Sequence, residues 1–234
     1  IVPLTPPPAF SCSGAGYGGI TTLGALSDIV TTSTGYVALR DAATGVVTVL
    51  GTGSGDITFT VPYAGTFCVY SCDAVGAASG DMLAFGDDAI NWFGLSIIDI
   101  TGYAATLTRF TMASFDLISF TGLELCTALE DVVIPAYPFP TLDVTTLVNA
   151  THLDVTDSIS LNTLLIPPGG VLDTIDAGNC GIQNTNDVLA AIVASGITGG
   201  IMNISGGTSA APSGAGIADL AFLTGTAGWI ISTN

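Results

Sequence analysis

The sequence predicts a mainly β protein whose central part is a solenoid of short stacked strands. Apolar residues recur at regular intervals between 95 and 182, which predicts coils that share one continuous core. Upstream, the alternation Ile-Thr-Phe-Thr-Val at 57–61 predicts an ordinary half-buried strand. Downstream, helical and strand patterns alternate. We therefore expect an extended arm at 1–33, a small β-sandwich-like domain at 34–80, a solenoid at 81–182 and an α/β cap at 183–234.

The solenoid prediction depends on a leucine-rich-repeat-like pattern. Residues 172–182 fill every position of the template L-x-x-L-x-L-x-x-N/C-x-L, with Ala177 the one weak substitution. Earlier frames begin at 95, 107, 118, 129, 142 and 153, mostly 11 to 13 residues apart, whereas one such coil takes roughly 20 to 29 residues. Two extended segments per coil would reconcile these lengths, and the echo of 128–135 at 160–167 supports them. The alternative is an ordinary antiparallel sheet with evenly spaced strands.

The first eighty residues predict an arm and then a strand meander. Four prolines, Pro3, Pro6, Pro7 and Pro8, remove backbone donors and favour extended chain, so we expect an arm that docks on a neighbouring subunit. A disordered or self-packed tail is the other interpretation. Strands are then expected at 36–40, 46–50, 57–61 and 66–70, with Gly- and Pro-containing turns between them. The small and acidic residues at 73–90 predict a junction into the repeats.

The last fifty residues predict two helices and two strands. Residues 186–195 have an Asn or Asp cap, helical apolar spacing and a following Gly196, which together predict a short helix. A strand at 201–204, a helix at 213–223 and a strand at 229–232 follow. Because the exposed end of a solenoid must be covered, we interpret this segment as its C-terminal cap.

Composition excludes several classes of partner. The 234 residues contain 2 Arg, no Lys and 19 acidic residues, for a formal net charge of −17. Phosphate backbones and anionic membrane surfaces would be repelled, so we predict neither a nucleic-acid partner nor membrane insertion. No apolar run reaches the length of a membrane span, and residues 1–10 lack the basic start of a signal peptide. A surface solvated mainly by hydroxyl groups suits an extracellular or virion-surface location, and we expect Ile1 to follow a processed or truncated segment.

The five cysteines divide into two groups. Cys126 and Cys180 occupy repeat positions that favour a small buried side chain, so we interpret them as core thiols. Cys68 and Cys72 are four residues apart in an alternating strand, so both face one side, where either could form a disulfide with Cys12. Because the count is odd, at least one cysteine is unpaired or pairs between chains.

No catalytic, cofactor or metal set emerges from the remaining motifs. Ser209 lies in a Gly-Thr-Ser segment like that around a subtilisin nucleophile, but the single histidine, His152, lies in a repeat frame without the expected context. Asp and Asn side chains could bind Ca²⁺ weakly, although solvated turn acids explain them better. Trp92, Tyr103 and Tyr137 could line a ligand face for sugars, although aromatic residues at repeat spacing are more often core or edge residues.

Several motifs resemble a known group of proteins. Residues 34–40 (TGYVALR), Cys72-Asp73-Ala74-x-Gly76 and Ser79-Gly80 precede the repeats, and 203–216 (NISGGTSAAPSGAG) and 229–234 (WIISTN) end the sequence. In these motifs the chain resembles leucine-rich-repeat-like surface and structural proteins of phages and aquatic bacteria, over roughly 34–234. It departs from them where Thr, Asp and Pro replace regular asparagine ladders. The resemblance implies a secreted or virion-surface structural or adhesive role and supplies no catalytic residues.

Two functions follow as expectations. The first is a non-enzymatic structural protein that assembles in many copies, as a virion decoration or fibre protein or as an extracellular filament subunit. Its partners would be further copies of itself or other structural subunits. The second is a secreted adhesin that binds a cell-surface glycan or receptor through the solenoid face.

Overall fold

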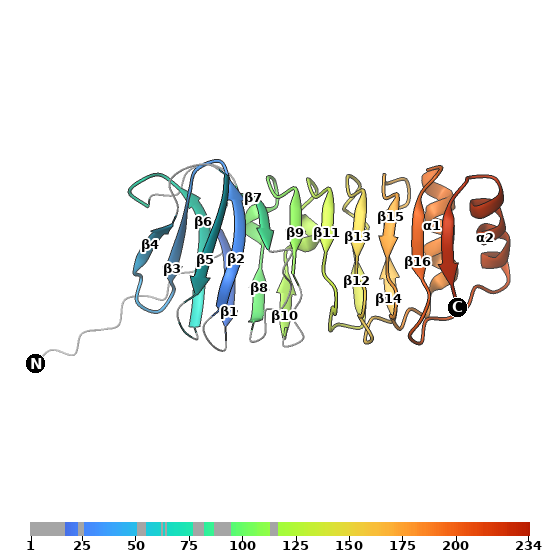
Figure 1. The fold of residues 1–234 in the computed structure, drawn as a ribbon, viewed down its shortest axis with the longest axis horizontal. Helices are drawn as coiled ribbons and strands as arrows, with labels where there is room; N and C mark the ends of the chain where they lie inside the picture. Colours follow the sequence, from blue (N-terminus) through green and yellow to red (C-terminus); the bar gives the residue numbers. More distant parts are fainter. Residues whose placement is uncertain are drawn as a thin grey trace, which may run out of the picture. The chain divides into compact units, whose positions relative to one another are not determined.

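The computed structural model describes residues 17–22, 26–50, 55–61, 63, 65–76, 82–86, 95–112 and 117–234. These residues form two compact units (Figure 1). The first unit takes in the described residues up to Leu107 together with 117–123, and the second takes in 108–112 and 124–234. Strands predominate in both, which confirms the mainly β prediction, and two helices lie near the C-terminus.

The first unit is built mainly from antiparallel strands. One group of strands runs in the order β10 (Ser119–Thr121), β8 (Leu95–Asp99), β1 (Tyr17–Thr22), β6 (Gly65–Cys72), β3 (Tyr36–Asp41) and β4 (Val47–Leu50), with only the β10–β8 pair parallel. A second group places β2 (Leu26–Ser33) between β5 (Gly55–Val61) and β7 (Met82–Gly86). Residues 67–72 of β6 are all buried, so this strand lies at the core of the unit.

The expected arm at 1–33 is wrong for its second half. β1 pairs with β6 and β8, and β2 pairs with β5 and β7, so residues 17–33 contribute two strands to the first unit, which therefore begins before the expected boundary at 34. Residue propensities did not predict β1, because glycine is unfavourable in strands and this strand contains two glycines. A Cβ atom on Gly18 would lie 2.4 Å from the Tyr103 ring, so the glycine is needed for that ring to pack on the strand. Pro3, Pro6, Pro7 and Pro8 lie outside the described residues.

The second unit is a stack of parallel strands. In one sheet β9 (Arg109–Thr111), β11 (Asp131–Val133), β13 (His152–Asp154), β15 (Thr174–Asp176), β16 (Ile201–Ile204) and β17 (Ile230–Thr233) follow one another. Between them the chain visits a second sheet, where β12 (Thr141–Asp143) pairs with β14 (Thr163–Leu165). All these pairings are parallel, so the alternative of an antiparallel sheet is wrong for this unit.

One register repeats along the stack. Asp131 pairs with Arg109, His152 with Asp131 and Thr174 with His152, which gives a repeat of about 22 residues. The next residue in each strand points inward and is buried: Phe110, Val132, Leu153, Ile175 and Met202. From β11 to β15 two extended segments therefore alternate within one repeat, in agreement with the frames at 129, 142 and 153. The frames at 95 and 118 fall instead on β8 and β10 of the first unit. The similar sequences at 128–135 and 160–167 contain β11 and β14, and these two strands lie in different sheets.

The helices at the end of the second unit replace strands of the second sheet. α1 (Thr185–Ser195) connects β15 to β16, and α2 (Ala215–Gly225) connects β16 to β17. Gly196 ends α1 in the left-handed conformation (φ 71°), in agreement with its predicted role. The predicted cap at the start of 186–195 is wrong, because α1 begins at Thr185 and both Asn186 and Asp187 lie inside it. Asn184 is the N-cap residue, but its side chain bonds the backbone of Leu164 and not the helix. Among the described residues no helix is long and apolar enough to cross a membrane.

Candidate functional site

The cysteines are structural. Cys68 is disulfide-bonded, and Cys12, one of its expected partners, lies outside the described residues. Cys72 is a buried free thiol in the same cluster as Cys68. Burial raises the pKa of Cys126 to about 12 and that of Cys180 to about 11, so both stay protonated at neutral pH. The prediction that these two are core thiols is confirmed.

The expected aromatic ligand face does not form. Tyr103 is 1% exposed and its hydroxyl donates to the carbonyl of Val69 in the first unit. Tyr137 belongs to the second unit, is also buried and packs edge-on against Phe139. Burial raises the pKa of both tyrosines, to about 12 for Tyr137. These two rings therefore stabilise their own cores, and Trp92 lies outside the described residues.

The outer face of the parallel sheet instead carries polar side chains. The first outward row, in register, is Arg109, Asp131, His152 and Thr174. Sequence reasoning missed this row, because it depends on which residues the repeat places side by side. The row could have been found in the sequence from the polar residue that begins each of these four short strands.

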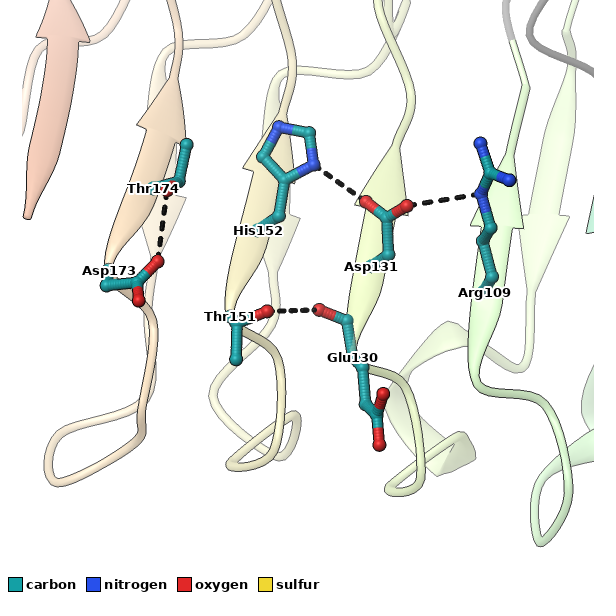
Figure 2. Close-up of polar contacts among 7 residues, drawn as sticks. All are labelled: Arg109, Glu130, Asp131, Thr151, His152, Asp173 and Thr174. Atoms are coloured by element: carbon teal, nitrogen blue, oxygen red, sulfur yellow. Dashed lines mark hydrogen bonds and ion pairs between the residues drawn. The ribbon is translucent and has the colours of Figure 1, made fainter.

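A shared carboxylate joins three strands in that row. Asp131 accepts from Arg109 Nε at 3.1 Å and lies 2.7 Å from His152 Nδ1 (Figure 2). The side chains are 47%, 31% and 37% exposed for Arg109, Asp131 and His152, so water competes for each charge. Within the described part of the chain, His152 Nε2 has no hydrogen-bond partner. Asp131 thus holds one imidazole nitrogen and leaves the other facing solvent.

Further polar side chains continue this face and its corner. Asp154, Asp176 and Asn203 form the second outward row, and Asn203 Nδ2 donates to Asp176 Oδ1 at 3.0 Å. Each side chain also accepts from backbone N–H or hydroxyl groups two residues on. At the following corner Asn179 Nδ2 donates to Asp157 Oδ1 at 2.8 Å. These acids hold the turns of the repeat in place.

Neither a hydrolytic triad nor a metal centre assembles from these groups. The Ser209 hydroxyl is buried, donates to the carbonyl of Cys180 and accepts from the N–H of Ile182. The hydroxyl is therefore used to hold the backbone at Cys180 and Ile182, while His152 is held by Asp131. In the part of the chain that the structure describes, no group of three or more His, Cys, Asp or Glu side chains gathers in a way that could hold a metal ion.

The end of the second unit has a different surface. From 188 to 234 the only charged side chain is Asp219. Helix α2 buries only Gly216 and Leu223, and leaves Ile217 and Phe222 58% and 46% exposed. Beside Phe222 lies a mostly apolar pocket of about 130 Å³, lined by residues of α1, α2 and the loops that follow them. This surface can bind apolar groups and offers nothing for acid–base chemistry.

Comparisons with known proteins return no relatives. No family model matches the sequence, and neither curated proteins nor solved structures contain a match.

Proposed function

We propose that this chain is a non-enzymatic structural subunit that assembles in many copies, on a virion surface as a decoration or fibre protein or in an extracellular filament. In this proposal the second unit is a leucine-rich-repeat-like β-solenoid, and the helices and strands from 185 onward form its cap. The resemblance to phage and aquatic-bacterial surface proteins favours the same role.

The observation that carries the proposal is how the polar groups of the second unit are used. The outward acids and amides bond to neighbouring strands and turns of their own unit: Asp131 to Arg109 and His152, Asn203 to Asp176, and Asn184 to Leu164. A catalytic group must be left available to a substrate and is commonly buried in a cleft. Groups that are exposed and bonded between repeats instead make a rigid element, which suits a structural subunit.

A first test is the size of the native material. Light scattering over a hundredfold range of protein concentration, combined with negative-stain electron microscopy, should show ordered particles or fibres of high copy number. A mass that stays at that of one chain throughout would contradict the proposal. Because β1 begins at Tyr17, a variant without the expected arm should lack only residues 1–16, so that the strand is kept.

An adhesin remains the second candidate, and the polar rows of the parallel sheet favour it. Arginine, histidine and carboxylate groups in register present donors and acceptors at regular intervals, which is the kind of surface that glycan hydroxyls match. Binding to a glycan array that is lost in Arg109→Ala and retained in Ile159→Ser, at an exposed position, would support it. Equal binding by these two variants, or none by the wild type, would contradict it.

A further inference from the structure

We propose that the C-terminal end of the second unit is a contact surface for the same end of a second copy of this chain. We call this surface the terminal patch and define it by the exposed side of α2, with Ile217, Ala221 and Phe222, and the outer edge of β17. The inference rests on the proposed assembly and names one of its interfaces.

Helix α2 is too apolar for a helix that remains in water. Its sequence, Ala-Gly-Ile-Ala-Asp-Leu-Ala-Phe-Leu-Thr-Gly, contains one charged residue, yet only two of its positions are buried. A surface helix normally turns charged residues outward and apolar residues inward. Here Ile217 and Phe222 are exposed although α2 already packs on α1. The helix therefore has a second apolar side that nothing among the described residues covers.

Phe222 stands at the rim of a recess. The pocket beside it is lined by Ile192, Val193 and Ile197 on one side and by Phe222, Leu223 and Ala227 on the other. A side chain from a partner could enter this recess and exclude water from Phe222. Well-packed aromatic residues at the centre of an interface contribute most of its binding energy.

Strand β17 adds an open backbone edge to the patch. It is the last strand of its sheet, pairs with β16 on one side and has no described strand on the other. Figure 1 shows α2 and β17 at the same end of the second unit. An edge strand offers unpaired N–H and C=O groups that another strand can complete. Two copies of this edge related by a two-fold axis run antiparallel, so each could bond the other.

The distribution of charge favours a second copy of this chain as the partner of the terminal patch. With a net charge of −17 and only two arginines, the chain has no cationic surface to offer to its own acidic coils. Copies therefore approach most easily where acids are absent, and 188–234 carries Asp219 alone. The segment 211–234 is also about as long as the roughly 20 to 30 residues per side that a standard interface uses. A self-complementary apolar patch of this kind favours a closed two-fold contact.

The experiment compares charge substitutions at exposed positions inside and outside the terminal patch. Phe222→Glu and Ala221→Glu put a carboxylate into the terminal patch, and Ile159→Glu puts the same charge on an exposed coil position. Sedimentation and light scattering should show self-association weakened at least about 100-fold by the patch variants and little changed in the control. Circular dichroism checks that each variant folds. Ala221 is exposed, so its variant tests the contact even if Phe222→Glu disturbs the pocket.

Cross-linking tests the two-fold arrangement directly. The free thiols Cys72, Cys126 and Cys180 are buried, so a cysteine introduced as Ala221→Cys would be the reactive one among the described thiols. A bis-maleimide linker should then join two copies of this single variant, and Ile159→Cys should give no comparable product.

The outcomes separate this inference from the proposed function. If Phe222→Glu and Ala221→Glu assemble like the wild type, the terminal patch is not an interface, while the structural role stands. Loss of assembly only when residues 1–16 are removed would likewise overturn the patch in favour of the arm. A wild type that stays monomeric would overturn both proposals.

Discussion

Residues 124–187 and 188–234 of the second unit both contribute to one series of parallel strands, but they present different surfaces. Residues 124–187 contain nine acidic residues, whereas residues 188–234 contain only Asp219. Exposed polar side chains of the first segment bond to neighbouring strands and turns, and in the second segment Ile217 and Phe222 are exposed. The comparison teaches that one series of parallel strands can carry acidic side chains in one part and exposed apolar side chains in another.

The largest expected effect is the loss of stability when a buried core residue of the second unit is truncated. Leu153→Ala removes a side chain that is 1% exposed, in register with the buried residues Val132 and Ile175 of the neighbouring strands. The cavity should lower the free energy of unfolding by about 2–5 kcal/mol. Ile159→Ala, at an exposed position of the same coil, should change it by less than about 0.5 kcal/mol. Chemical denaturation measures both, and equal effects would argue against a continuous core.

An intermediate effect is expected where the start of α1 meets β14. Asn184 donates to the carbonyl of Leu164 at 2.8 Å and accepts from its N–H at 3.1 Å, so one amide joins the start of α1 to β14. Asn184→Ala should cost about 1–3 kcal/mol, because two partly buried backbone groups lose their partner. Asn184→Asp keeps the acceptor and should cost less. If α1 and the residues after it unfold at the same denaturant concentration in Asn184→Ala and in wild type, this coupling is contradicted.

The smallest effect on stability is expected from the partly exposed pairs that Asp131 forms with Arg109 and His152. Asp131→Asn removes the charge shared by Arg109 and His152, and these side chains are all partly solvated. The free energy of unfolding should fall by less than about 1 kcal/mol, and by less again at high salt. Asp143→Asn, at an exposed position that caps its own turn, is the matched control for loss of one negative charge. A loss of several kcal/mol in Asp131→Asn would show that the row is a structural centre.

Local patterns predicted much of this fold because they reflect local physics. The residues Ile175, Ala177, Cys180 and Ile182 were expected inside from their spacing, and all are buried. The two helices, and the strands after them, lie within two residues of their expected bounds, since helical periodicity and Gly196 act within a few residues. Cys126 and Cys180 were likewise placed correctly as core thiols.

Other features needed the tertiary structure. Strand β1 is rich in glycine and has weak strand preference, so its pairing depends on β6, β8 and the Tyr103 ring that packs on Gly18. Tyr103 and Tyr137 looked like candidates for a ligand face, and only burial showed that they belong to the cores.

By itself, the sequence determined the strand-rich character, the repeat spacing, the C-terminal helices and the concentration of charge outside the last segment, because each is a property of neighbouring residues or of composition. Tertiary structure alone decided that the Asp131 carboxylate contacts both Arg109 and His152, and that no described residue covers Ile217 and Phe222 of α2. Residues about 22 apart in the sequence become neighbours only when the strands pair in a given register. The exposed side of a helix can be recognised only when the positions of the elements around it are known.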